Sequence, residues 1–156
     1  MKKSLFFLLL VTASFSACKK DSVTIDKKDI AGSWYYQIYN VQYFDANNQL
    51  LYNNNSSVDQ IEVLPGYIFN ADMSGSYGSS PYTYNIKKAT NTKDSLIIIG
   101  PNYNHRFLIL GINKDQMVLQ ENLKQADPLR NVSSGQVIYS TYRQWNITLG
   151  RTKFTR

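Results

Sequence analysis

Apolar and polar residues alternate with a period of two along much of the chain, and this pattern predicts β-strands. The alternation is clearest at 81–87 and at 145–149. Residues 95–99 are apolar at both parities, which predicts a strand buried on both faces. Further strands are predicted at 33–44, 50–52, 59–64, 66–71, 106–112, 116–120 and 137–142.

Aromatic residues are concentrated in these predicted strands, and the chain holds 12 Tyr, 7 Phe and 2 Trp. Aromatic and β-branched residues favour strands, so composition and pattern agree. In 33–44, parity places Trp34, Tyr36 and Ile38 on one face, and Tyr35, Tyr39, Val41 and Tyr43 on the other. In 81–87, Tyr82, Tyr84 and Ile86 share a face.

Turn-forming residues separate the predicted strands at short intervals. The turns are expected at 47–48, 65–66, 72–75, 100–102 and 113–115, with a flexible loop at 122–135. One helical turn is expected at 26–31, with Asp26 as its N-cap. Eight to ten short strands without a long helix predict an all-β fold, namely an antiparallel up-and-down β-barrel, with a β-sandwich as the alternative. A barrel of about eight strands leaves space for one small ligand.

The N-terminus is typical of a signal peptide. A positive start at Lys2 and Lys3 is followed by an apolar stretch and a region of small residues that ends at residue 17. A helix over 5–17 would reach about 20 Å, short of the roughly 30 Å of a bilayer core. We therefore expect three parts: a signal peptide at 1–17, a lipidated Cys18 with a tether at 18–26, and a β domain at 27–156.

Ser16-Ala17-Cys18 resembles the lipobox of bacterial lipoproteins, although Phe15 stands where that motif usually has Leu. The resemblance implies that Cys18 carries the lipid and that the membrane is a partner. The residues at 19–21 resemble the starts of Bacteroidota lipoproteins, which implies the outer membrane and leaves the periplasmic or cell-surface face open. Cys18 is the only cysteine, so an intramolecular disulfide is impossible.

The domain itself resembles the lipocalin-like domains of Bacteroidota lipoproteins. Three segments carry the resemblance: the Gly-x-Trp opening at 30–34, the strand and turn at 68–75, and the late hairpin at 107–119. In lipocalins a basic residue of the last strand packs over the opening tryptophan. The resemblance therefore implies that Arg151, or Lys153 with the same parity, lies over Trp34.

The residues do not form a catalytic or metal-binding pattern, so we expect a protein that is not an enzyme and that has no cofactor and no metal. His105 is the only histidine, and its parity places it beside Phe107 and Ile109 as a hydrogen-bonded residue rather than a general base. Removal of the signal peptide lowers the net charge from +6 to +4, because Lys2 and Lys3 are lost. The remaining positive residues are scattered, which argues against nucleic acid as a partner.

The aromatic residues carry the remaining functional signal. The side chains of Trp34, Tyr36, Tyr67, Tyr82 and Tyr84 are candidates to line the barrel and to bind a small apolar or amphipathic ligand. Tyr and Trp together with Asn form, as an alternative, an outer surface that binds glycan or another envelope protein. A third interpretation is that the same rings only fill the core.

Overall fold

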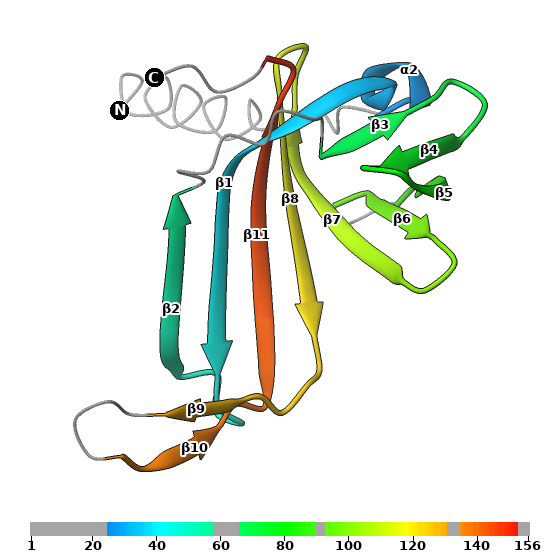
Figure 1. Cartoon of the computed structure of the whole chain (residues 1–156). Coiled ribbons are helices and arrows are strands. Elements are labelled where there is room, and N and C mark those ends of the chain that lie inside the picture. Colours follow the sequence, from blue (N-terminus) through cyan, green and yellow to red (C-terminus); the bar gives the residue numbers. More distant parts are fainter. Residues whose placement is uncertain (1–24, 58–65, 90–92, 131–134, 153–156) are drawn as a thin grey trace, which may run out of the picture.

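The computed structural model describes residues 25–57, 66–89, 93–130 and 135–152, and it is an all-β structure (Figure 1). Eight antiparallel strands close into a barrel, which confirms the predicted lipocalin-like barrel against the sandwich. The strands of the ring are β1 (Gly32–Phe44), β3 (Tyr67–Phe69), β4 (Ser74–Tyr77), β5 (Ser80–Lys87), β6 (Ser95–Ile99), β7 (Asn104–Ile112), β8 (Gln116–Leu123) and β11 (Tyr142–Gly150).

The ring is an up-and-down meander, because each of its strands pairs with the next and β11 pairs back with β1. One edge of β1 pairs with β11 over most of its length. The other edge pairs first with β3 and then with β2 (Leu50–Ser57), which lies outside the ring. Consequently β2, β1, β11 and β8 run on beyond the barrel as a four-stranded sheet, which we call the extended sheet (Figure 1).

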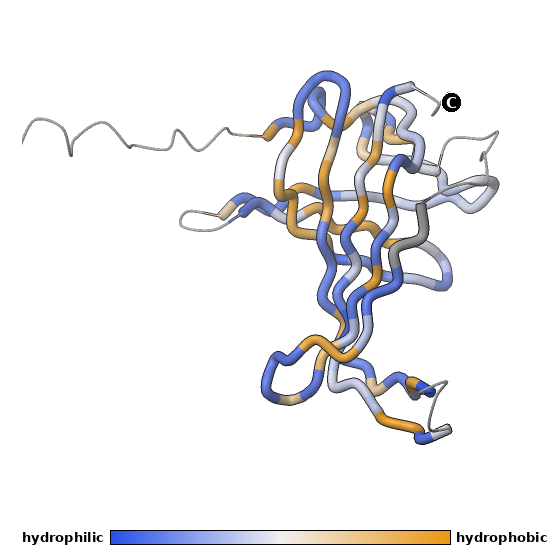
Figure 2. Tube along the Cα trace, turned by 90° about the vertical axis from the view of Figure 1, so that its left-hand side faces the viewer, coloured by the Kyte–Doolittle hydropathy of each residue, from blue (hydrophilic) through white to orange (hydrophobic). Residues whose placement is uncertain are grey.

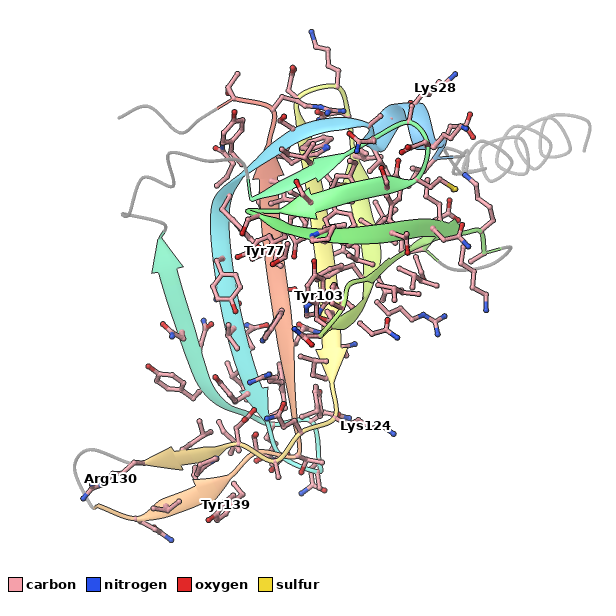
Figure 3. All side chains as sticks on the ribbon, turned by 45° about the vertical axis from the view of Figure 1, so that its right-hand side comes forward. Lys28, Tyr77, Tyr103, Lys124, Arg130 and Tyr139 are labelled. Carbon is pink, nitrogen blue, oxygen red and sulfur yellow. The ribbon has the colours of Figure 1, made fainter. Side chains whose placement is uncertain are left out.

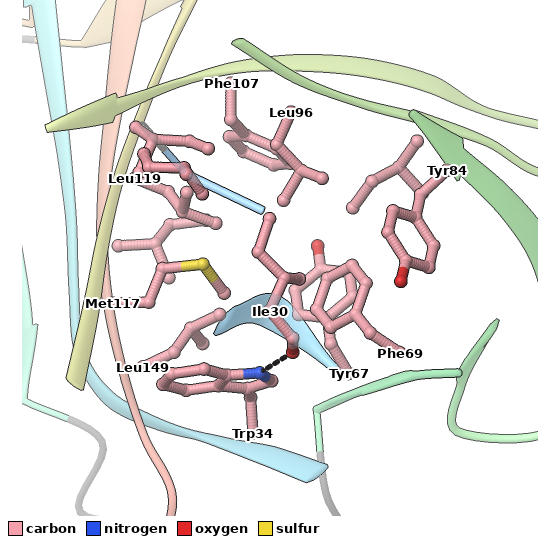
Figure 4. Close-up of a cluster of buried hydrophobic side chains, with 14 of the residues drawn as sticks. Ile30, Trp34, Tyr67, Phe69, Tyr84, Leu96, Phe107, Met117, Leu119 and Leu149 are labelled. Carbon is pink, nitrogen blue, oxygen red and sulfur yellow. Dashed lines mark hydrogen bonds between the residues drawn. The ribbon is translucent and has the colours of Figure 1, made fainter. Parts of the chain in front are cut away.

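The hydrophobic core fills the end of the barrel that α2 (Lys27–Ile30) covers, which we call the closed end. Ile30 and Trp34 lie there against Met117 and Leu149, all without exposed surface (Figure 4). Apolar positions are concentrated in the barrel, and hydrophilic ones are more frequent along the strands that continue from it (Figure 2). The opposite end, where the strands pass into the extended sheet, is called the sheet end.

Several local predictions are confirmed. Asp26 is the N-cap of α2, and its backbone N–H donates a hydrogen bond to Asp29 Oδ2 at 2.7 Å. The hairpin turn at 113–115 is closed by a bond from Asn113 N–H to Gln116 O at 2.9 Å. The expected face of β5 is also correct, since Tyr82 and Tyr84 are buried.

The predicted faces of β1 are wrong beyond Tyr36. A β-bulge lies between Tyr36 and Ile38, so that Gln37 has no counterpart on β11. One extra residue reverses the parity of everything after it. Ile38 therefore points outward with 56% of its surface exposed, while Tyr39 and Val41 join Tyr36 on the inner face.

The burial expected for 95–99 and the length expected for the strand at 50–52 are also wrong. Leu96 and Ile98 of β6 are buried, but Ile99 is 52% exposed, since the outer face of the barrel meets solvent. The polar run at 53–57 continues β2, because its backbone pairs with β1 despite the low strand propensity of Asn.

The stretch at 122–135 is not one flexible loop. It contains the end of β8 and then β9 (Pro128–Arg130), which pairs with β10 (Val137–Tyr139) in a separate two-stranded sheet at the far end of the extended sheet. The strand expected at 137–142 is divided between β10 and β11, and β4 begins inside the turn expected at 72–75. Ile25, expected in the tether, packs in the core. The signal peptide, Cys18 and the strand predicted at 59–64 lie outside the described residues.

Candidate functional site

Trp34, a predicted ligand-lining residue, is sealed into the closed end. Its indole Nε1 donates a hydrogen bond to Ile30 O at 2.6 Å (Figure 4). The guanidinium of Arg151 lies 3.8 Å from the centre of its ring and donates to Ala31 O at 2.7 Å and to Asp29 O at 2.9 Å. The predicted cation–π contact is therefore confirmed for Arg151, whereas Lys153 lies outside the described residues.

Gly32 makes room for this arrangement. Its φ of +121° is a conformation that residues with a Cβ rarely adopt, and a Cβ there would collide with Nη1 of Arg151. The glycine of the Gly-x-Trp opening thus has a physical reason. The guanidinium of Arg151 passes close to the Gly32 backbone to reach the Trp34 ring, and a side chain at Gly32 would block it. The closed end is a structural plug rather than an entrance.

Tyr82 and Tyr84, also predicted to bind ligand, have hydroxyls that are already occupied. Tyr82 donates to Ile68 O at 2.8 Å, and Tyr84 donates to Asn70 O at 2.6 Å. Burial raises the pKa of both phenols. These bonds connect β5 with the β3–β4 hairpin, so the two rings serve core packing.

Tyr36 and Tyr67, the remaining two predicted residues, meet at the sheet end. The Tyr36 hydroxyl forms hydrogen bonds with Tyr67 and with Tyr77, a residue of β4 that is 40% exposed. The ring centres of Tyr36 and Tyr67 are 5.9 Å apart, and those of Tyr67 and Tyr77 are 5.0 Å apart. Burial, followed by the neighbouring phenols, raises the pKa of Tyr36 far above its usual value. At this end the tyrosine hydroxyls face one another instead of the backbone.

The rings continue from these tyrosines across β1, β11 and β7. Tyr39 lies 6.4 Å from Tyr36 and 6.1 Å from Trp145, measured between ring centres. His105 lies 5.7 Å from Trp145 and 5.5 Å from Tyr103. We call this set the aromatic cluster: Tyr36, Tyr39, Tyr67, Tyr77, Tyr103, His105 and Trp145. Two of its members, Tyr77 and Tyr103, are labelled at this end of the barrel in Figure 3.

A buried carboxylate lies within the aromatic cluster. Glu121 is only 3% exposed, and both of its oxygens are paired. Oε2 lies 2.8 Å from His105 Nδ1, and Oε1 accepts a hydrogen bond from the backbone N–H of Arg106 at 2.8 Å. The expectation that His105 is hydrogen-bonded is therefore confirmed. Glu121 was not among the predicted site residues, although its parity with Met117 and Leu119 places it on the inner face of β8.

Tyr103 differs from the other tyrosines of the cluster. Its hydroxyl is buried and has no hydrogen-bond partner among the described residues. A buried polar group without a partner is destabilising by about 1–3 kcal/mol, so such groups are rare. Burial raises the pKa of Tyr103, so its hydroxyl stays a proton donor at neutral pH.

No protein-family model, no curated protein and no solved structure matches this chain. Function must therefore be inferred from its own residues. Within the described ranges, His, Cys, Asp and Glu form no group of three that could hold a metal ion. In the same ranges, no helix has the length and apolar character needed to cross a membrane.

Proposed function

We propose that the protein is a lipid-anchored, non-enzymatic protein of the bacterial outer membrane whose barrel binds a small amphipathic ligand at the aromatic cluster. One observation carries the proposal. The inner aromatic residues run from the core, where the polar atoms of Trp34, Tyr82 and Tyr84 bond to the backbone, through Tyr67 to the sheet end, where the Tyr103 hydroxyl is unpaired among the described residues.

The chemistry of the cluster supports this ligand class. Ligand sites are mostly apolar and aromatic, with a few polar groups that fix orientation. Here the rings of Tyr39, Trp145 and His105 supply flat apolar walls. The Tyr103 hydroxyl offers a hydrogen bond, and the Glu121 side chain is held in place by its bonds to His105 Nδ1 and to the backbone N–H of Arg106. A ligand with an aromatic or alicyclic body and one polar acceptor matches these groups.

The proposed anchor rests on the sequence at Cys18. Each methylene group that enters a bilayer contributes about 0.8 kcal/mol, and stable anchoring needs two lipid signals, such as two acyl chains. A diacylglyceryl group on Cys18 would meet that requirement. We propose a non-enzymatic role because the described neighbours of the His105 imidazole are a carboxylate and aromatic rings, not a nucleophile.

Two experiments test ligand binding. Native mass spectrometry on protein purified gently from the bacterial envelope shows whether a small molecule is retained. Residues 19–156, secreted without lipid, are then titrated with N-phenyl-1-naphthylamine, whose fluorescence rises in an apolar site. Binding at the cluster should also quench Trp145, and Trp145→Phe should remove that quenching because Trp34 is sealed away at the closed end.

Matched tyrosine variants locate the site. Tyr103→Phe removes the unpaired hydroxyl, whereas Tyr84→Phe removes one that already bonds Asn70 O. A ligand that accepts a hydrogen bond from Tyr103 should bind Tyr103→Phe about fivefold more weakly, since one hydrogen bond is worth about 1 kcal/mol. Tyr84→Phe should bind normally. The proposal fails if no small molecule is retained and the probe stays dark, or if Tyr84→Phe weakens binding as much as Tyr103→Phe.

A further inference from the structure

The outer face of the extended sheet carries two cross-strand rows made entirely of carboxamide residues. The strand register puts one residue from each of β1, β11 and β8 in both rows, and the first row also takes one from β2. The first row is Asn53, Gln42, Gln144 and Asn122, and the second is Asn40, Asn146 and Gln120. We call these positions the amide rows. No position in them is charged or apolar.

The amide rows point away from the aromatic cluster, because they have the opposite parity to Val41, Glu121 and Trp145. Several of their side chains hydrogen-bond along the rows. Gln144 Nε2 donates to Asn122 Oδ1 at 3.0 Å, and Gln120 Nε2 donates to Asn146 Oδ1 at 2.9 Å. These bonds hold the amides in defined positions. Asn53 on β2 and Asn122 on β8 are exposed to solvent.

This composition is unusual for a strand surface. Asn is depleted in strands, where β-branched and aromatic residues are favoured, and four of the seven positions are Asn. An amide offers two N–H donors and a carbonyl with two lone pairs, so Asn122 and Gln144, which make one and two bonds with other amides of the rows, keep capacity for a ligand. A surface of fixed donors and acceptors without charge complements a neutral molecule rich in hydroxyls.

A pocket of about 600 Å³ lies where the first row ends. Its walls include Asn122 and Gln144 of that row, together with Asn48, Lys124, Gln125, Ala126, Thr141 and Tyr142. Lys124, labelled in Figure 3, is its single charged residue. The Tyr142 ring stacks on Phe44, with ring centres 4.9 Å apart, and its hydroxyl donates to Asn48 Oδ1 at 3.0 Å. The Tyr142 ring is thus an aromatic wall of the pocket among polar groups, and the stacking on Phe44 and the hydrogen bond to Asn48 hold it in place.

We propose that the amide rows and this pocket bind a neutral oligosaccharide. Its hydroxyls exchange hydrogen bonds with the amides along a row, where neighbouring strands are about 4.8 Å apart, a spacing close to one sugar residue in an extended chain. The apolar face of a terminal sugar packs on Tyr142 in the pocket. This site is on the opposite face of the sheet from the aromatic cluster and does not depend on the function proposed for the barrel.

The test is a titration of the ¹⁵N-labelled whole chain, purified from membranes in a sugar-free zwitterionic detergent. The probes are the neutral hexasaccharides cellohexaose, laminarihexaose, maltohexaose and xylohexaose. At least one should shift the side-chain NH₂ signals of Asn122 and Gln144. It should leave those of Asn85, an exposed amide on β5, unchanged. This readout uses the unaltered protein and so does not depend on whether a variant folds.

Matched variants then separate binding from chance contact. Gln144→Leu removes an amide of the rows, and Asn85→Leu is its control outside them. Gln144→Leu should weaken the active hexasaccharide about fivefold or more, because at least one hydrogen bond is lost, while Asn85→Leu should match the unaltered protein. Tyr142→Leu should abolish binding in the pocket, whereas Tyr142→Phe, which keeps the ring, should retain most of it.

Three results would overturn the proposal. One is that none of the four hexasaccharides shifts the Asn122 and Gln144 signals. Another is that Asn85→Leu weakens binding as much as Gln144→Leu. The third is that light scattering finds a dimer that Gln144→Leu dissociates, because the amide rows would then pair with a second copy of the chain.

Discussion

Replacing Arg151 by Met should strongly destabilise the barrel while leaving its surface chemistry almost unchanged. Arg151→Met keeps a long side chain over Trp34 but removes the charge and two hydrogen bonds, those to Ala31 O and Asp29 O. Hydrogen bonds made by charged groups contribute about 1.5–3 kcal/mol each, and a cation–π contact contributes about 0.5–2 kcal/mol. Arg151 is only partly buried, so we take the lower end of each range and expect a loss of about 3.5 kcal/mol.

Urea unfolding followed by tryptophan fluorescence measures this loss, and Trp34 reports it directly because the guanidinium lies on its ring. Arg151→Lys should retain about half of the stabilisation, since an ammonium keeps the charge but lacks the planar fork that reaches both carbonyls. Arg106→Met, at an exposed position on β7, is the control and should change stability by less than about 0.5 kcal/mol. A loss below about 1 kcal/mol for Arg151→Met would refute the view that this contact closes the barrel.

Three further outcomes are expected. Gly32→Ala should destabilise the fold by about 2 kcal/mol or more in a urea titration, because its φ is positive and the new Cβ meets Arg151; a neutral effect would contradict the close approach. Burial raises the pKa of Tyr36 and Tyr67, so both stay protonated in the folded protein at pH values above 10. The tyrosines of the unfolded chain ionise near pH 10. Stability should therefore be unaffected by these residues below about pH 10 and fall as the pH rises above it, with tyrosinate absorbance appearing together with unfolding. Cys18→Ser should move the protein from the membrane to the soluble fraction and remove the mass of the lipid, and a variant that stays in the membrane fraction would exclude Cys18 as the anchor.

The barrel could be predicted from the sequence because its strands are short and locally patterned. The alternation in β5 and in β11 identifies their inner faces without knowledge of any partner strand. The resemblance to lipocalins implied that Arg151 or Lys153 lies over Trp34, and Arg151 makes that contact. The strand faces depend on residues that are close in sequence, so local alternation is enough to predict them.

The aromatic cluster could not be predicted, because its geometry depends on a pairing irregularity. Parity put Tyr36 and Tyr39 on opposite faces, but the bulge at Gln37 brings both to the inner face. A bulge is set by the register with β11, more than a hundred residues further along the chain, and nothing local indicates it. The five predicted ligand residues were consequently separated into Tyr36 and Tyr67 at the cluster and three rings in the core.

The amide rows could not be predicted from the sequence for a related reason. Their members come from four strands, and β2 was expected to end before its asparagines. These Asn and Gln residues are far apart in the sequence, and only the register of β2, β1, β11 and β8 brings them together on one surface. Asparagine usually favours turns, but here residues of β2 that include asparagines pair with the long β1.

Strands β1 and β11 carry both the amide rows and part of the aromatic cluster, and they therefore also determine which insertions and deletions the gene can tolerate. In β1 and β11 the amides and the aromatic residues alternate on opposite faces, so gaining or losing one residue would bring amides into the barrel and rings to the outside. The β9–β10 hairpin forms its own small sheet and lies outside that register. Length variation among natural variants of this protein should therefore be concentrated between β8 and β11, and β1 should keep its length.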